Sequence, residues 1–256
     1  MAKYYGRGLE AGGGSDDILH GGPGKDTLDG GAGNDLLHGS GGNDELIGGS
    51  GADILRGGSG LDTASYRASS EPVFVDLTGN IALGGDANGD TFFGIENIEG
   101  SNGADIVTGN QSGNMLAGLL GGDSLHGGAG RDLVDGGGGR DFLTGSGGAD
   151  MILGGSGDDL IDAGTGRDLV VGGSGNDVIY GGPDVDVIIY DFAWEEMNVR
   201  YRGSDYSIWV DAPDGWDHIF SALTIATTTG TYRFNVPTGS WVHDSNMTGD
   251  DWLAGW

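Results

Sequence analysis

An acidic or amide side chain recurs at every ninth residue through most of this chain of 256 residues. When each nonapeptide is numbered from 1 to 9, this side chain stands at position 6. The residues are Asp17, Asp26, Asp35, Asp44, Asp53, Asp62, Asp105, Asn114, Asp123, Asp132, Asp141, Asp150, Asp159, Asp168, Asp177 and Asp186. Side-chain oxygens in such a series suit a hard cation of flexible coordination, such as Ca²⁺. Zinc or copper would favour His or Cys, and neither recurs at a turn position.

The residue two places after each of these side chains is aliphatic, with one Ala. Position 8 holds Leu19, Leu28, Leu37, Leu46, Leu55, Ala64, Val107, Leu116, Leu125, Val134, Leu143, Ile152, Ile161, Val170, Ile179 and Ile188. Positions 7 and 9 tolerate polar residues, which predicts a very short strand with its centre pointing inward. Positions 1 to 6 are mostly Gly, which accepts positive φ without steric cost, so they predict a turn. Two nonapeptides then complete one coil of a parallel β-roll.

A coil of this length places each position 6 above the position 6 of the repeat after next. Adjacent coils lie about 4.8 Å apart. Carboxylates at that distance repel, and both stay ionised only with a cation between them. Stacked pairs such as Asp132/Asp150 and Asp150/Asp168 therefore predict several bound Ca²⁺ ions, and Asn114/Asp132 should bind more weakly. One buried aliphatic per repeat does little against the chain entropy, so the repeats should fold only with bound ions.

The chain divides into five segments. Residues 1–11 are expected to be a tail, 12–65 a first repeat block, 66–99 an irregular spacer, 100–189 a second block and 190–256 a cap. The end of the spacer returns to the repeat register, so one continuous roll is favoured over two separate rolls. The last segment holds all six Trp and predicts antiparallel strands that cover the open end of the roll. An aromatic surface for carbohydrate is the alternative for this segment.

Alternation of apolar and polar residues predicts five strands outside the repeats. They are Val73–Leu77, Asn80–Leu83, Asn198–Tyr201, Tyr206–Asp211 and Thr231–Val236. In the spacer, Asp86, Asp90 and Glu96 are either additional metal ligands or members of an ordinary acidic turn.

The repeats resemble the RTX (repeats-in-toxin) family of secreted calcium-binding proteins. The resemblance is carried by nonapeptides such as GGAGRDLVD at 127–135 and GGSGDDLID at 154–162, which follow the family pattern G-G-x-G-x-D-x-U-x. The spacer also resembles segments of mannuronan epimerase R-modules and serralysin-type C-terminal domains. The resemblance implies that backbone carbonyls near positions 2 and 4 complete each site. These are Gly22, Gly24, Gly31, Gly33, Gly49, Gly51, Gly128, Gly130, Gly137, Gly139, Gly155, Gly157, Gly173 and Gly175.

The resemblance also implies a route out of the cell. RTX proteins typically leave Gram-negative bacteria unfolded through the type I secretion apparatus, guided by an uncleaved C-terminal signal, which would lie within 190–256 here. Folding would then follow export, because external calcium is high and cytosolic calcium is low. The N-terminal residues lack an apolar segment typical of a cleaved signal peptide, and the chain has no Cys for disulfides.

Composition restricts the other partners. With 39 acidic and 11 basic residues, the formal net charge is −28, which argues against nucleic acid and anionic membrane surfaces. No apolar run is long enough to span a membrane. The chain contains no H-E-x-x-H and no G-x-S-x-G motif, so no catalytic residue is assigned and the chain is expected not to be an enzyme.

Two other functions stay open at this stage. One is an accessory module that binds an acidic polysaccharide such as alginate, which would need a basic stripe; Arg131 and Arg167 would lie on one side of the roll. The other is an adhesin or surface-layer fragment, which residues 248–255 favour because they resemble the start of a further repeat.

Overall fold

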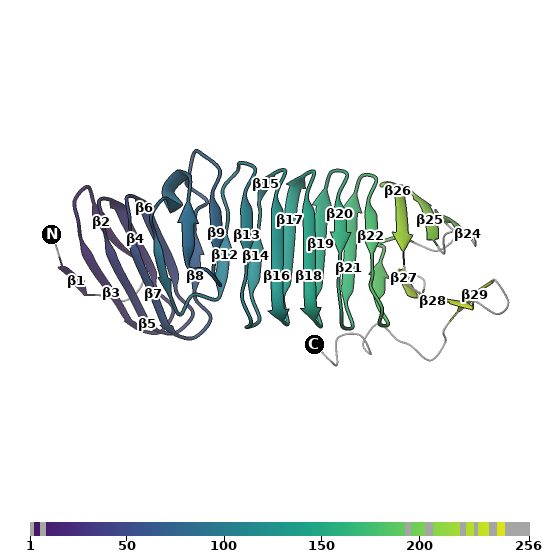
Figure 1. Ribbon diagram of the computed structural model, residues 1–256, viewed down its shortest axis with the longest axis horizontal. Coiled ribbons are helices and arrows are strands. Elements are labelled where there is room, and N and C mark those ends of the chain that lie inside the picture. Colours follow the sequence, from purple (N-terminus) through teal and green to yellow (C-terminus); the bar gives the residue numbers. More distant parts are fainter. Residues whose placement is uncertain are drawn as a thin grey trace.

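A computed structural model describes residues 3–5, 9–192, 196–202, 207–220, 224–227, 230–235 and 240–243. It is an elongated roll in which the strands of successive coils lie side by side along the long axis (Figure 1). The described part contains the 3₁₀ turn η1 (Gly85–Ala87), and no described helix is long and apolar enough to cross a membrane. The all-β parallel roll with antiparallel strands near its C-terminus, predicted from the sequence, is confirmed.

Three sheets make up the described roll. One side carries two of them in succession. The first holds β1 (Lys3–Tyr5), β3 (Ile18–Pro23), β5 (Leu36–Gly41), β7 (Ile54–Ser59) and β11 (Thr91–Phe93). The second, in spatial order, holds β10 (Ile81–Leu83), β9 (Phe74–Asp76), β13 (Ile106–Thr108), β16 (Ser124–Gly130), β18 (Phe142–Gly148), β20 (Leu160–Asp162), β22 (Val178–Tyr180), β26 (Gly215–Phe220), β25 (Ser207–Ala212) and β24 (Asn198–Arg202).

The opposite side is a single long sheet. It holds β2 (Leu9–Gly13), β4 (Thr27–Ala32), β6 (Glu45–Ser50), β8 (Thr63–Ser65), β12 (Asn97–Glu99), β14 (Met115–Ala117), β17 (Leu133–Gly139), β19 (Met151–Ser156), β21 (Leu169–Ser174), β23 (Val187–Ile189), β27 (Thr224–Thr227), β28 (Gly230–Asn235) and β29 (Ser240–His243), while β15 (Leu120–Gly121) pairs with β17. Because β8, β12 and β14 are neighbours, this sheet passes through the spacer without a break.

The position-8 residues fill the interior. All sixteen are 0% exposed, and residues of this position pair with one another across adjacent coils, as Leu125 does with Leu143. The strands are longer than the predicted ones in many coils. β16, for example, continues from Ser124 through the glycines to Gly130, because positions 2 to 4 also pair with the next coil.

The spacer follows the predicted register at its end. Ile98 pairs with Ala64 and Leu116, both at position 8, and the Glu96 carboxylate accepts a hydrogen bond from the Asp62 amide as a position-6 side chain would. The two strands predicted at the start of the spacer form the antiparallel pair β9 and β10.

Both ends of the roll extend beyond the repeats. The residues expected to be an N-terminal tail contain β1 and β2, which pair with β3 and β4. After the second block, β26 and β27 pair in parallel with β22 and β23 and add a further coil. The remaining strands of this end pair antiparallel, as predicted. Residues 248–255 lie outside the described residues.

Candidate metal sites

The aspartates at position 6 form ladders along the edges of the roll. In most of them the backbone amide donates to Oδ1 of the aspartate eighteen residues later, as between Asp123 and Asp141 at 2.7 Å and between Asp150 and Asp168 at 2.9 Å. These side chains are at most 3% exposed. The predicted stacking of position 6 on position 6 is therefore present, with Oδ1 fixed by the preceding coil.

The second carboxylate oxygen of most of these aspartates is buried without a hydrogen-bond donor among the described residues. This Oδ2 belongs to Asp35, Asp44, Asp53, Asp62, Asp123, Asp132, Asp141, Asp150, Asp159, Asp168, Asp177 and Asp186. An ionised oxygen that is buried and unpaired is costly. Its repetition through both blocks indicates that something outside the protein pairs with it.

Burial alone makes these carboxyls hard to ionise. It is the main reason why the pKa of Asp53, Asp123, Asp168 and Asp177 rises to about 7. For Asp168, the neighbouring carboxylates of Asp186 and Asp150 raise the pKa further, while the hydrogen bond from the Asp150 amide lowers it. A cation beside Oδ2 would reverse this cost.

The turns beside these oxygens share one backbone feature. Position 2 has positive φ in fourteen repeats, which we call the open turns. The residues are Gly13, Gly22, Gly31, Ser40, Gly49, Gly58, Leu119, Gly128, Gly137, Ser146, Gly155, Gly164, Gly173 and Gly182. Leu119 has φ 76° and Ser146 has φ 73°, a conformation that residues other than Gly rarely adopt. All twelve unpaired Oδ2 atoms lie in open turns.

The first two repeats of the second block differ, and we call their turns the bonded turns. Ser101 and Asn110 stand at position 2 without positive φ, and their amides turn toward position 6. The Ser101 amide donates to Asp105 Oδ2 at 2.6 Å, and the Asn110 amide donates to Asn114 Oδ1 at 2.8 Å. Asp105 Oδ1 also accepts from the Val73 amide and the Ser101 hydroxyl. Asp105 and Asn114, both expected to be ligands, therefore have their oxygens bonded within the protein.

The glycines predicted to offer carbonyls all have positive φ. The stacking is too tight for a side chain at several of them: a Cβ on Gly155 would overlap the carbonyl oxygen of Gly137, and one on Gly157 would overlap that of Gly139. Carbonyl oxygens at positions 2 and 4 thus point along the roll toward the next coil. The position-2 carbonyl can also accept a backbone hydrogen bond from the neighbouring coil, as the Leu119 carbonyl does from the Gly138 amide.

Two rungs of the ladders come from outside the nonapeptides. Asp90 Oδ1 accepts from the Asp53 amide, and Asp217 Oδ1 accepts from the Asp177 amide. Asp90 is one of the three spacer acids that the sequence left open as additional metal ligands or as members of an ordinary acidic turn. Asp217 was missed, because forty residues separate it from Asp177 and no period leads to it.

Comparison with known proteins agrees with this geometry. Residues 11–37, 29–64, 90–125, 117–152 and 153–188 match the model of the RTX calcium-binding nonapeptide repeat (4 copies), and together they cover more than half of the chain. The chain belongs to this family. Its roll is therefore a calcium-binding β-roll, built of repeats that are generally structural rather than catalytic.

Two further comparisons add little. The chain is similar to the crystal structure of extracellular lipase LipA from Serratia marcescens, at 18% identity and a TM-score of 0.30, over 84% of this chain and 38% of the lipase chain. It thus spans less than half of that lipase. No curated protein matches the chain.

The open turns fit calcium as the RTX family implies. Twelve of them offer a buried oxygen without a donor among the described residues, and their carbonyls face the neighbouring coil, which gives the all-oxygen donor set that Ca²⁺ prefers. Among the described residues, no three His, Cys, Asp or Glu side chains converge on one point, so a metal ion held in an open turn would need backbone oxygens as well.

Proposed function

We propose that this chain is a secreted protein or module that folds when its open turns bind Ca²⁺ outside the cell. The observation that carries the proposal is the series of buried Oδ2 atoms without donors, which leaves the ladders incomplete without a counter-ion. Typical secretion of RTX proteins by type I systems supports the location.

Different atoms of the repeat have different roles in this proposal. In the open turns, Oδ1 of most position-6 aspartates ties the coil to the preceding one, and Oδ2 serves as the charged ligand. Carbonyls near positions 2 and 4, such as those of Gly137 and Gly139, supply neutral oxygens. Bound calcium supplies the positive charge that keeps the stacked carboxylates ionised. Because each ordered coil presents hydrogen-bond partners to the next, binding along one ladder should be cooperative.

Calcium affinity should match an extracellular setting. Extracellular calcium modules have dissociation constants of about 10⁻⁴–10⁻³ M. The direct test is equilibrium dialysis against buffered calcium with elemental analysis, on the full chain and with magnesium as the comparison. We expect multiple ions per chain near millimolar calcium and few at micromolar calcium. A chain that binds no calcium at millimolar concentration would refute the proposal.

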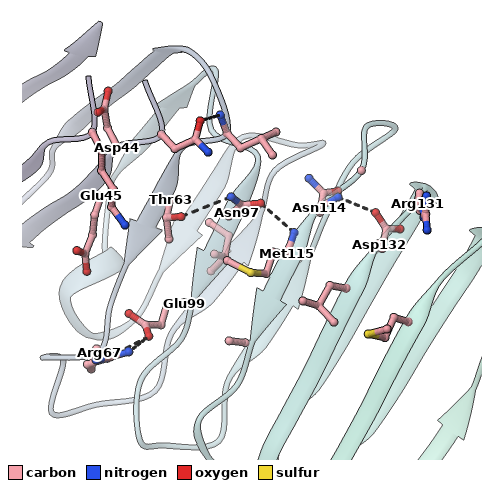
Figure 2. A pocket seen from close by; sticks show the side chains of 18 residues that line it. Asp44, Glu45, Thr63, Arg67, Asn97, Glu99, Asn114, Met115, Arg131 and Asp132 are labelled. Atoms are coloured by element: carbon pink, nitrogen blue, oxygen red, sulfur yellow. Dashed lines mark hydrogen bonds and ion pairs between the residues drawn. The ribbon is translucent and has the colours of Figure 1, made fainter. Parts of the chain in front are cut away.

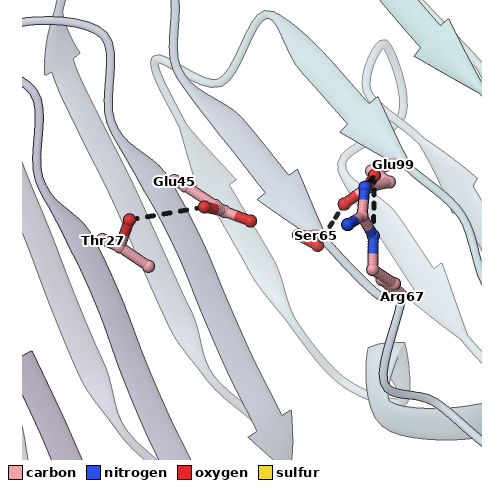
Figure 3. Close-up of polar contacts among 5 residues, drawn as sticks. All are labelled: Thr27, Glu45, Ser65, Arg67 and Glu99. Atoms are coloured by element: carbon pink, nitrogen blue, oxygen red, sulfur yellow. Dashed lines mark hydrogen bonds and ion pairs between the residues drawn. The ribbon is translucent and has the colours of Figure 1, made fainter. Parts of the chain in front are cut away.

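The polysaccharide hypothesis requires a basic stripe, which the hollow among the described residues does not provide. This hollow, about 630 Å³, lies on the outer face of the long sheet where the two blocks meet, and Figure 2 shows its lining. Lys25, Arg67 and Arg131 line it, but so do Glu45 and Glu99. Arg67 is paired with Glu99, which also accepts from the Ser65 hydroxyl (Figure 3). This mixed lining forms no basic stripe, so we propose no second function.

A further inference from the structure

Two of the ladders end on an aspartate whose second oxygen is occupied by a tyrosine. The Tyr66 hydroxyl donates to Asp90 Oδ2 at 2.9 Å, and the Tyr190 hydroxyl donates to Asp217 Oδ2 at 2.6 Å. Both tyrosines are nearly buried, at 2% and 5% exposure. Each pair thus supplies from the protein the partner that the twelve unpaired Oδ2 atoms lack.

The two tyrosines hold the same place in the repeat. Tyr66 directly follows β8 at the end of the first block, and Tyr190 directly follows β23 at the end of the second. Each stands at position 1 of the nonapeptide that would come next. Within the blocks this position is Gly, with Ala163 as the one exception.

The reason for glycine at position 1 is the carboxylate of its own repeat. A Cβ on Gly145 would meet Oδ2 of Asp150, and one on Gly172 would meet Oδ2 of Asp177. A tyrosine is accommodated because its carboxylate partner comes from a later segment. Asp90 follows Tyr66 by 24 residues and Asp217 follows Tyr190 by 27.

Both closing aspartates are true members of their ladders. Asp90 Oδ1 lies 2.8 Å from the Asp53 amide and Asp217 Oδ1 lies 2.9 Å from the Asp177 amide, as between interior rungs. They are 3% and 1% exposed. What separates them from the interior rungs is the donor on Oδ2.

We propose that the Tyr66–Asp90 pair and the Tyr190–Asp217 pair hold no metal ion, and we call them closing rungs. Asp90 ends the aspartate ladder that runs through Asp35 and Asp53, and Asp217 ends the ladder that runs from Asp123 to Asp177, each with a protein hydrogen bond in place of an ion. The inference rests on the proposed calcium binding of the interior rungs. It assigns the position-1 Tyr as the residue that marks where each of these two ladders stops, and it limits the calcium sites to the open turns.

The test compares isosteric variants of an interior and a closing rung in the full chain. Asp53→Asn and Asp90→Asn each remove one charge from adjacent rungs of the same ladder. Calcium bound per chain is measured by equilibrium dialysis at one free calcium concentration near half saturation. We expect Asp53→Asn to bind fewer ions than the parent chain and Asp90→Asn to bind the same number.

The outcomes separate the inference from the proposed function. If Asp90→Asn loses as many ions as Asp53→Asn, Asp90 is a calcium ligand and the inference is wrong, while the ladder stands. If Asp53→Asn binds as many ions as the parent chain, the proposed ligand role of position 6 fails instead.

A second measurement tests the hydroxyl. Tyr66→Phe and Tyr190→Phe keep the ring but leave a buried carboxylate oxygen without a donor, so the unfolding temperature in saturating calcium should fall by roughly 3–10 °C. Tyr180→Phe is the matched control, because that side chain is 40% exposed. Equal unfolding temperatures for all three variants would overturn the closing role of the hydroxyls.

Discussion

The bonded turns and the open turns of the second block follow the same nonapeptide pattern but treat their position-6 oxygens in opposite ways. In the bonded turns, Ser101 and Asn110 direct their amides at the position-6 side chain. In the open turns, as at Ser146, positive φ accompanies a position-6 Oδ2 with no protein donor, here that of Asp150. The backbone at position 2, rather than the aspartate itself, separates a carboxylate held by the protein from one left for an ion.

The largest difference should appear when the two kinds of rung lose their side chain. Asp150→Ala removes one ligand and disturbs the sites on both sides, so the calcium concentration at half folding should rise roughly five- to thirtyfold, which corresponds to 1–2 kcal/mol. Asp105→Ala removes three hydrogen bonds, so it should lower stability in saturating calcium without changing the number of bound ions. Calcium titrations and ion counts of both variants check this, and a normal titration of Asp150→Ala would contradict it.

Open turns that have Gly at position 2 should be destabilised by a side chain there. Gly155→Ala places a Cβ at φ 104° and against the Gly137 carbonyl, which should cost about 2–3 kcal/mol in the free energy of unfolding. The control is Gly138→Ala at position 3, where the nearest atoms are ends of the Ser156 and Leu120 side chains. Chemical denaturation in saturating calcium measures both, and equal stability of the two variants would count against the open-turn geometry.

Protonation of the buried aspartates at lower pH should provide part of the stability that bound calcium provides. Burial raises the pKa of Asp53, Asp123 and Asp168 from 3.8 to about 7, so the folded chain without metal binds more protons than the unfolded chain between these values. Stability from these groups is then complete below about pH 4 and is lost as pH rises through about 7. Circular dichroism in chelator from pH 8 to pH 5.5 should show increasing β structure. More structure at pH 8 than at pH 5.5 would contradict the assignment.

The smallest effect concerns strain in an open turn. Ser146 is exposed and has φ 73°, so Ser146→Gly should raise stability by about 1 kcal/mol. Ser174→Gly is the control at an exposed strand residue without positive φ, where Gly should lower stability by about 0.5–1 kcal/mol. Thermal unfolding of both in calcium gives the comparison, and a loss of stability in Ser146→Gly would show that the turn is not strained.

The period of nine predicted most of the roll because it reports two things at once, the buried aliphatic and the stacked acid. Ile98 and Glu96 could be placed from the register alone, even in a segment where the glycines fail. The N-terminal coil could not, because Glu10 stands where Leu28 stands in the next coil. The coil that contains Asp217 could not be predicted either, because β24 and β25 lie between it and the last repeat and interrupt the period.

Residue type also did not reveal which turns are open. Ser101 and Ser146 both stand at position 2, and only Ser146 has positive φ. Ser101 follows the spacer, where the Val73 amide already occupies Asp105 Oδ1. This contact joins residues 32 apart in the sequence, so it could not be predicted from a pattern that repeats every nine residues. The tyrosines at positions 66 and 190 did carry a signal, as the places where a large residue replaces the position-1 glycine.

The most direct test of calcium-coupled folding is far-ultraviolet circular dichroism of the purified full chain, titrated with Ca²⁺ from a chelated start at pH 8, with Mg²⁺ as the control. Fourteen open turns and a net charge of −28 lead us to expect a steep transition from coil to β structure in calcium and none in magnesium. A chain that is already folded in chelator, with a spectrum unchanged by calcium, would contradict calcium-coupled folding.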